Sequence, residues 1–405
     1  IKPLARGAIP LINWRLRDVS LPESRVVLSG MPSCANCHSF SNDGSTLAMD
    51  VDGPQGDKGA YAIASISEEM LIGDDEVITW NSFAGRPEGH KTIGFLSRIS
   101  PDGKHALTTL NESVYVANFT DYRFLQVFFP TRGILAWYST ETGEMKALPG
   151  ADDPDYVHCN GVWSPDGKWV VFSRATAFDP YSQGKPLATR PNDPNEARIQ
   201  YDLYRIPFAN GQGGTPEPIA GASANGMSNT FPKVSPDGKW IVFTRCRNGL
   251  LMRPDGRLWI VPAEGGEARE MRCNTSRMNS WHSFSPNSRW MVFSSKTNTP
   301  YTQAFLTFID ADGRDSPAIL IPNSTADNRA VNLPEFVNIP YDSLNTIRVP
   351  AVAHIALFAE AMELKREEDY AGVVAKLVQA VGEDPDYMKA RRELGYGLLK
   401  LGRPR

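Results

Sequence analysis

The sequence predicts a mainly β fold, a propeller of short antiparallel sheets, followed by a small helical domain. Three observations support this prediction. A hairpin-like sequence word recurs along the chain, 33 Gly and 31 Pro accompany an absence of long helical patterns before about residue 350, and the hydrophobic period changes after Pro350. Short strands joined by turns explain the first two observations, and helices explain the third.

The recurring word consists of a short strand, a turn rich in Pro, Asp and Gly, and a second strand rich in Val, Ile, Phe and Trp. Glycine tolerates the positive φ that such a turn needs, and aromatic and branched residues favour strands. The Ser before the turn marks five copies, separated by 59, 64, 71 and 50 residues: Ser41, Ser100, Ser164, Ser235 and Ser285. This spacing is typical of propeller blades that carry loop insertions.

A third and a fourth strand follow most copies, which predicts four-stranded blades. Third strands are expected at residues 201–206, 258–261 and 305–309. Because one blade cannot bury both of its faces, the copies should close into a ring. A degraded inner strand, LPEFVN from Leu333, predicts a sixth blade that strands near residues 14–19 and 25–28 complete, although five or seven blades also agree with the pattern.

The word SPDGKW, followed by Ile or Val and then by Val and Phe, resembles the WD40-like (PD40) repeats of TolB-type propellers. The resemblance covers roughly residues 30 to 340 and implies a β-propeller. We therefore divide the chain into an N-terminal segment (1–29) that closes the last blade, a propeller (30–345) and a helical tail (350–405).

From Pro350 the composition shifts to Ala, Leu, Glu and Lys at helical spacing. A helix of small residues, the pair Asp384 and Pro385, and the run LGYGLLKLGR resemble one and a half tetratricopeptide (TPR) repeats. Such a short array either packs on the propeller or docks a partner peptide, and a pair of capping helices is the structural alternative.

The composition limits the classes of function. The 405 residues include 42 Lys and Arg against 46 Asp and Glu, a formal charge of −4, which argues against a nucleic-acid-binding protein. No run of about 18 uncharged apolar residues is present, so no membrane-spanning helix is expected. The chain starts at Ile1 rather than Met, and a removed signal sequence is one explanation.

The strongest chemical signal is the motif C-x-x-C-H at Cys34, Cys37 and His38, the signature of c-type heme attachment. Two thiols at this spacing form thioethers with the heme vinyl groups, and the His ligates the iron from one side. A redox dithiol and half of a zinc site are the alternatives. The sequence has no βαβ setting for the dithiol and no second C-x-x-C to complete the zinc site. The sequence therefore predicts one covalent heme c.

The motif runs directly into the first copy of the word, so the heme is expected at the mouth of the propeller channel. His38 stands three residues before Ser41, and the same offset in the fifth copy gives His282, the first candidate for the opposite iron ligand. His158 and Met227 are reserve candidates from equivalent loops. A His in a propeller loop is more often a hydrogen-bonding residue.

Two further predictions concern the same face of the propeller. Cys246 and Cys273, at the ends of the second and fourth strands of one blade, are expected either to form a disulfide or to remain two thiols. An insertion at residues 175–200 is expected to be either a lid or docking loop or an inert surface excursion.

These patterns predict an extracytoplasmic monoheme c-type cytochrome, in the periplasm or at the cell surface, that transfers electrons within a larger redox assembly. A redox partner protein or other cytochrome subunits would be its partners, and no catalytic residue is predicted. The alternatives are a heme enzyme or ligand sensor with an open iron site, and a non-redox docking scaffold.

Overall fold

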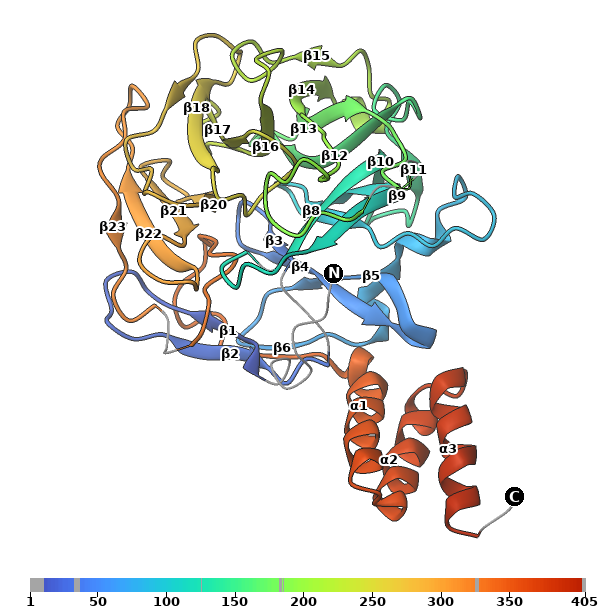
Figure 1. Ribbon diagram of the computed structural model, residues 1–405. Helices are drawn as coiled ribbons and strands as arrows, with labels where there is room; N and C mark the ends of the chain where they lie inside the picture. The colour runs from blue at the N-terminus through green and yellow to red at the C-terminus, as the bar shows by residue number, and fades with distance from the viewer. Residues whose placement is uncertain are drawn as a thin grey trace.

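The computed structural model describes residues 11–32, 37–124, 126–181, 184, 186–324 and 328–402. Within these residues, antiparallel sheets are arranged in a ring and a group of helices lies beside the ring (Figure 1). The predicted mainly β fold with a small C-terminal helical region is confirmed.

Five four-stranded units follow one another along the described chain. The first unit consists of β3 (His38–Phe40), β4 (Thr46–Gly53), β5 (Asp57–Ser65) and β7 (Val77–Thr79), and the second of β8 (Phe95–Ile99), β9 (His105–Asn118), β10 (Gln126–Ser139) and β11 (Met145–Ala147). The third unit consists of β12 (Tyr156–Trp163), β13 (Trp169–Thr176), β14 (Asp202–Pro207) and β15 (Glu217–Pro218), and the fourth of β16 (Ser228–Val234), β17 (Trp240–Cys246), β18 (Arg257–Pro262) and β19 (Arg269–Glu270). The fifth unit consists of β20 (Asn279–Phe284), β21 (Trp290–Ser295), β22 (Gln303–Phe308) and β23 (Ile319–Leu320). The pairs within each unit are antiparallel, and one parallel pair, Gly133 with Val157, joins the second and third units.

The Ser of each word fixes the hairpin turn. In the first unit the Ser41 hydroxyl donates to Asp43 (2.6 Å) and accepts from the Thr46 amide (3.0 Å), and Gly44 has a φ of +72°. The same two bonds recur at the other four copies: Ser100, Ser164, Ser235 and Ser285. Because these side chains satisfy polar groups of the turn, the sequence word specifies the hairpin locally.

Four inner strands carry a bulge at the same place. Leu96, Asn160, Phe231 and Trp281, each four residues before the Ser of its word, have φ values between 52° and 58°, and the register of each strand shifts there. A left-handed conformation is unfavourable for Leu, Phe and Trp, so the surrounding packing must hold it at Leu96, Phe231 and Trp281. Cys37 occupies the corresponding place in the first unit.

Segments from both ends of the chain close the ring between the fifth and first units, and we call them the closing sector. Residues 331–338 bridge the two units, because the Phe336 amide donates to the Ser283 hydroxyl (3.2 Å) and the Asn338 side chain donates to the Asn42 carbonyl (3.0 Å). The sector also contains the antiparallel pair β1 (Asn13–Leu16) and β2 (Arg25–Ser29) and the parallel pair β24 (Thr346–Arg348) and β6 (Glu69–Leu71). The predicted degraded inner strand thus lies between the two units, although it is not paired as a strand.

The helical region consists, within the described residues, of α1 (Ala353–Arg366), α2 (Tyr370–Glu383) and α3 (Met388–Lys400). Short 3-10 turns also occur: η2 (Pro54–Gly56), η3 (Asp74–Glu76), η4 (Trp80–Ser82), η5 (Ala209–Gly211) and η6 (Pro350–Val352). The helices share an apolar core that includes Ala361, Val373 and Leu377, and they contact the ring where the Gln55 amide donates to Asp384 (3.3 Å). No helix of the described residues has the length and apolar character needed to cross a membrane.

Candidate functional site

The structure places two of the three motif residues at the start of the first inner strand. Cys34 lies outside the described residues, Cys37 immediately precedes β3, and His38 is the first residue of β3. The Cys37 carbonyl accepts from the Asp50 amide (3.1 Å), and the Cys37 side chain packs against an apolar cluster that spans several units. Cys37 and His38 therefore enter the ring together on its inner side.

Mostly apolar side chains surround this place, and we call them the channel collar. Five of them stand four residues before the Ser of a word: Cys37, Leu96, Asn160, Phe231 and Trp281. The sixth, Leu333, belongs to the closing sector. All except Asn160 belong to or pack against the same apolar cluster, and Asn160 is itself buried. Phe231 and Trp281 meet edge to face with ring centroids 5.1 Å apart. The Cys37 thiol is thus set in an apolar environment.

Three charged residues meet next to the collar, and we call Arg98, Lys233 and Glu335 the charge layer. Glu335 Oε1 lies 3.0 Å from Lys233 Nζ and 3.5 Å from Arg98 Nη1, and the side chains are 9% to 16% exposed. They come from the second unit, the fourth unit and the closing sector. Because these parts are not neighbours in the ring, they can meet only near its axis.

His38 contacts the charge layer through Glu335. Its Nε2 atom lies 3.3 Å from Glu335 Oε2, and its ring packs against Trp14 of β1 and Phe40, with centroids 4.7 and 5.8 Å apart. Arg98 Nη1 donates to the His38 carbonyl (2.6 Å). Aromatic packing and a carboxylate therefore set the orientation of this imidazole.

The charges of this layer change one another's pKa. Burial alone would raise the pKa of Glu335, but Lys233, Arg98 and His38 outweigh burial and lower it to about 2. Burial, followed by the charge of Arg98, lowers the pKa of Lys233 to about 8 in spite of Glu335. Glu335 is therefore ionised at neutral pH and serves as counterion to two cations.

A second carboxyl, Asp50, lies beside Cys37. Burial raises the pKa of Asp50 to about 7, against the effects of a hydrogen bond with the Cys37 side chain and the charge of Arg98. The other four units have Thr or Ser at this position, nine residues after the Ser of the word: Thr109, Ser173, Thr244 and Ser294. A carboxyl at this position is thus a feature of the unit that carries the motif.

His282, the first candidate for the opposite iron ligand, contacts the fourth unit in the described structure. His282 is 1% exposed, its Nε2 lies 2.9 Å from the Val242 carbonyl, and its ring meets Phe231 edge to face at 5.4 Å. Burial lowers the pKa of His282 to about 3, so the ring is neutral and Nε2 donates its proton to Val242. The two positions match in the sequence word but not in orientation, because His38 faces the closing sector and His282 faces the fourth unit.

His158 also points away from the collar. It lies between Val157 and Cys159, whose side chains reach the apolar cluster, so its own side chain faces the opposite side of β12. Its ring stacks on Phe172 with centroids 5.6 Å apart. Burial, followed by the charge of Arg174, lowers the pKa of His158 to about 4.

Met227 lies in the turn that precedes β16. Its amide donates to Asn225 (3.1 Å) and its carbonyl accepts from Asn229 (3.2 Å). Among the residues that the structure describes, no group of three or more His, Cys, Asp or Glu side chains is arranged to hold a metal ion. The identity of an opposite iron ligand therefore stays a prediction.

Of the two alternatives for Cys246 and Cys273, a disulfide or two thiols, the structure has two free thiols. Cys246 ends β17 and Cys273 follows β19, so β18 lies between them. Two strand spacings of roughly 4.8 Å place them about 10 Å apart, beyond the reach of a disulfide. The Cys246 thiol instead donates to the Asn248 carbonyl (3.4 Å), and the Cys273 amide donates to Asp315 (2.7 Å).

The insertion at residues 175–200 packs against the cluster that contains the collar. Ala188 and Ile199 are buried members of that cluster. Glu196 and Arg253 form an ion pair with 1% of each side chain exposed, and Arg253 Nη2 donates to Glu196 Oε2 (2.9 Å). Part of the insertion is therefore packed into the fold.

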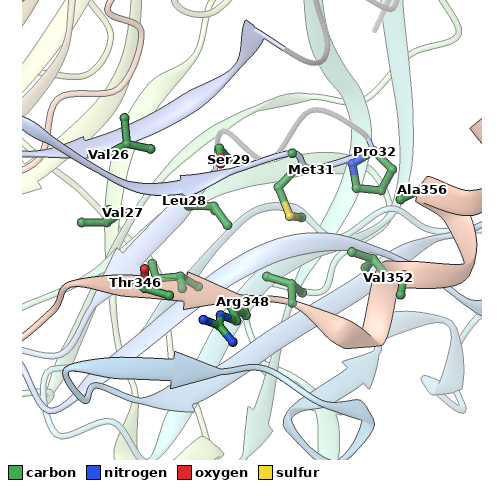
Figure 2. A pocket seen from close by; sticks show the side chains of 14 residues that line it. Val26, Val27, Leu28, Ser29, Met31, Pro32, Thr346, Arg348, Val352 and Ala356 are labelled. Carbon is green, nitrogen blue, oxygen red and sulfur yellow. The ribbon is translucent and has the colours of Figure 1, made fainter. Parts of the chain in front are cut away.

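A cavity of about 450 Å³ opens within the closing sector, between β2 on one side and β24 with the start of α1 on the other (Figure 2). Its lining includes Leu28, Met31 and Val352, and Arg348 supplies a cation. Pro32, also in the lining, directly precedes the undescribed part of the motif loop. The cavity is thus a second place, adjoining the motif loop in the chain, where mostly apolar residue types and a cation line a hollow.

Of the three residues that would hold a covalently attached heme, the structure describes Cys37 and His38. Cys37 stands among apolar side chains, and His38 supplies an imidazole that packing holds in place. Iron ligation at His38 Nε2 would replace its contact with Glu335.

Sequence reasoning missed the charge layer and Trp14. A signal for Arg98 and Lys233 was present in the aligned words, because both stand two residues before the Ser of the word. The other copies have small or apolar residues there: Ser39, Val162 and Ser283. A charge on an inner strand is unusual enough to mark a special site.

Compared with protein families and with curated proteins, the sequence matches none. Among solved structures, it is similar to TolB from Acinetobacter baumannii, with 18% identity and a TM-score of 0.45 over 80% of this chain and 65% of that chain. A TolB-type protein from Agrobacterium tumefaciens shows 16% identity and a TM-score of 0.45, over 76% and 87% of the two chains. An oligogalacturonate lyase in complex with manganese shows 16% identity and a TM-score of 0.42, over 76% and 73%. The chain thus spans about two thirds of the length of the Acinetobacter protein, and likeness at this level does not bear on function.

Proposed function

We propose that this protein is an extracytoplasmic monoheme c-type cytochrome in which a propeller carries one heme through Cys34 and Cys37, with His38 as the iron ligand. The observation that supports it is the place of Cys37 and His38, which start an inner strand between the channel collar and the charge layer. A heme held there supplies one-electron transfer. In this proposal the closing sector counts as the sixth blade.

The chain's own residues suit this role. His38 pairs with Met49 of β4 across the sheet, and Trp14 packs against the His38 ring. Rigid elements therefore hold the proposed ligand in place. The insertion anchored by Glu196 and Arg253 packs against the collar's cluster. We place the protein in the periplasm or at the cell surface, with a redox partner protein or other cytochrome subunits as its partners.

A heme stain after denaturing electrophoresis tests the proposal, because only covalent heme survives denaturation. The protein is produced in a host that attaches heme c outside the cytoplasm. We expect the wild type to stain, the double variant C34A/C37A to be colourless, and Cys159→Ala, which removes a buried thiol of the same cluster, to stain normally. A colourless wild type from the native host, with Cys34 and Cys37 joined to each other or to zinc, would leave the non-redox docking scaffold.

A heme enzyme or ligand sensor with an open iron site is the second candidate. The observation that favours it is the bond between His282 Nε2 and the Val242 carbonyl, which engages the nitrogen that a His most often offers to iron. Absorption spectra with carbon monoxide separate the two functions. Low-spin spectra that carbon monoxide does not change favour electron transfer, and a high-spin spectrum that shifts on addition favours the open site.

A further inference from the structure

We infer that Arg98 and Lys233 form a carboxylate-binding site at the axis of the ring, and that a propionate of the attached porphyrin occupies it in the mature protein. The inference rests on the proposed function and deepens it. It gives the charge layer a ligand, and it places the propionate edge of the heme next to Arg98 and Lys233.

The charges of the layer do not balance. Lys233 Nζ has one partner among the described residues, Glu335 Oε1 at 3.0 Å, although an ammonium carries three donors. Arg98 Nη1 donates to the His38 carbonyl and approaches the same Glu335 oxygen at 3.5 Å. Asp50, which also feels the charge of Arg98, is engaged in a hydrogen bond with the Cys37 side chain. Among the described residues, Glu335 is the one carboxylate at ion-pair distance from these two largely buried cations, and a second anion there would complete the pairing.

The collar determines what kind of anion fits. Arg98 and Lys233 both lie over the ring of Phe231, at 5.8 and 5.7 Å from its centroid, and Phe231 belongs to the collar. A ligand at this place meets apolar and aromatic side chains on one side and two cations on the other. A porphyrin has this chemistry, because its apolar macrocycle carries two carboxylates, and a guanidinium pairs well with a carboxylate.

The cavity of the closing sector is the competing location. It offers apolar walls and the single cation Arg348. The charge layer offers two cations, and its Glu335 already contacts His38, the residue that would bind the iron. The layer is therefore the better partner for an acid group on the same porphyrin.

The test compares heme-loaded variants by resonance Raman spectroscopy of the propionate bending modes and by redox titration. Lys233→Met is expected to shift a propionate mode and to stabilise the ferric form, raising the ferric-to-ferrous ratio at a fixed potential by about three- to tenfold, where tenfold equals about 59 mV for one electron. Lys233→Arg should keep the wild-type values. Arg98→Lys keeps the charge but loses the planar fork, and it serves as the second variant, with a shift of the same mode expected.

Lys296→Met is the matched control. Lys296 is another lysine whose pKa burial lowers to about 8, and its Nζ lies 5.1 Å from the ring centroid of Phe124 in the same apolar cluster, but it is not part of the charge layer. We expect its spectrum and potential to match the wild type.

Each result decides the question. A wild type without covalent heme overturns the proposed function and this inference together. Covalent heme whose propionate modes are unchanged in Lys233→Met and Arg98→Lys overturns this inference alone. A shift caused by Arg348→Gln instead would place the propionate in the cavity of the closing sector and would also overturn it.

Discussion

The Nε2 atom of His38 and the Oε2 atom of Glu335 lie 3.3 Å apart, although the two residues belong to opposite ends of the propeller sequence. The contact joins the first inner strand to the closing sector. It also ties the proposed heme ligand to the charge layer, since Glu335 is the counterion of Arg98 and Lys233.

Replacing Glu335 by Gln should lower the free energy of unfolding by about 3 kcal/mol, because two largely buried cations lose their counterion. Urea unfolding followed by circular dichroism measures the change. Glu141→Gln is the matched control, since Glu141 pairs with Lys104 where both side chains are more than half exposed, and it should change stability by less than about 1 kcal/mol. Equal free energies of unfolding for Glu335→Gln and the wild type would show that the two buried cations do not need this carboxylate for stability.

Stability should fall as the pH drops from 6.5 to about 4, in part because of His158. Its pKa is lowered in the folded state to about 4, so the unfolded chain binds a proton first and each pH unit in this window removes about 1.4 kcal/mol. His158→Phe keeps an aromatic ring against Phe172 and removes this contribution. The slope of stability against pH should then decrease by about 1.4 kcal/mol per pH unit in this window, while His282, with its pKa lowered to about 3, keeps its own contribution. An unchanged slope in His158→Phe would show that His158 does not contribute to the pH dependence of stability.

His282→Ala should destabilise the fold without changing the heme spectrum. Its buried ring leaves a cavity and the Val242 carbonyl loses its donor, which together should lower the free energy of unfolding by about 2 to 3 kcal/mol. Absorption spectra of the oxidised and reduced protein are the measurement, with His38→Ala as the variant expected to alter them. A changed spectrum in His282→Ala would identify His282 as the opposite ligand.

Glu196→Gln should loosen the insertion over the collar. The change leaves Arg253 buried without its carboxylate, which costs about 3 kcal/mol or more locally. Limited proteolysis with mass spectrometry should detect faster cleavage between residues 177 and 200. The double variant E196L/R253M should restore most of the resistance, because neither charge is then present. Wild-type cleavage rates in Glu196→Gln would show that the pair does not anchor the insertion.

Much of the fold follows from local chemistry. The Ser, Asp and Gly of four words, and Ser285, Asn287 and Ser288 of the fifth, satisfy and shape their own turn, so hairpins such as the one at Ser235 are visible in the sequence. The expected third strands at 201–206, 258–261 and 305–309 coincide closely with β14, β18 and β22. The change to helical periodicity after Pro350 likewise reflects contacts between residues close in the chain.

The site depended on relationships that no local pattern contains. His38 and His282 share an offset in the word, yet their rings point to different neighbours, because orientation depends on the unit packed alongside. The strand ends of Cys246 and Cys273 left a disulfide and two thiols both open, and the sheet spacing keeps the two thiols apart. Glu335 meets Lys233 only because the ring brings distant segments to one axis.

The closing sector draws β1 and β2 from one end of the chain and residues 331–348 from the other. A polypeptide that emerges N-terminus first therefore exposes Cys37 and His38 long before Glu335 has been made. In the proposed cytochrome, covalent modification of the motif and completion of the circle would be rival events in time. The event that comes first would decide whether the imidazole of His38 meets the iron or Glu335, which would make the timing of biogenesis part of how the molecule acquires its chemistry.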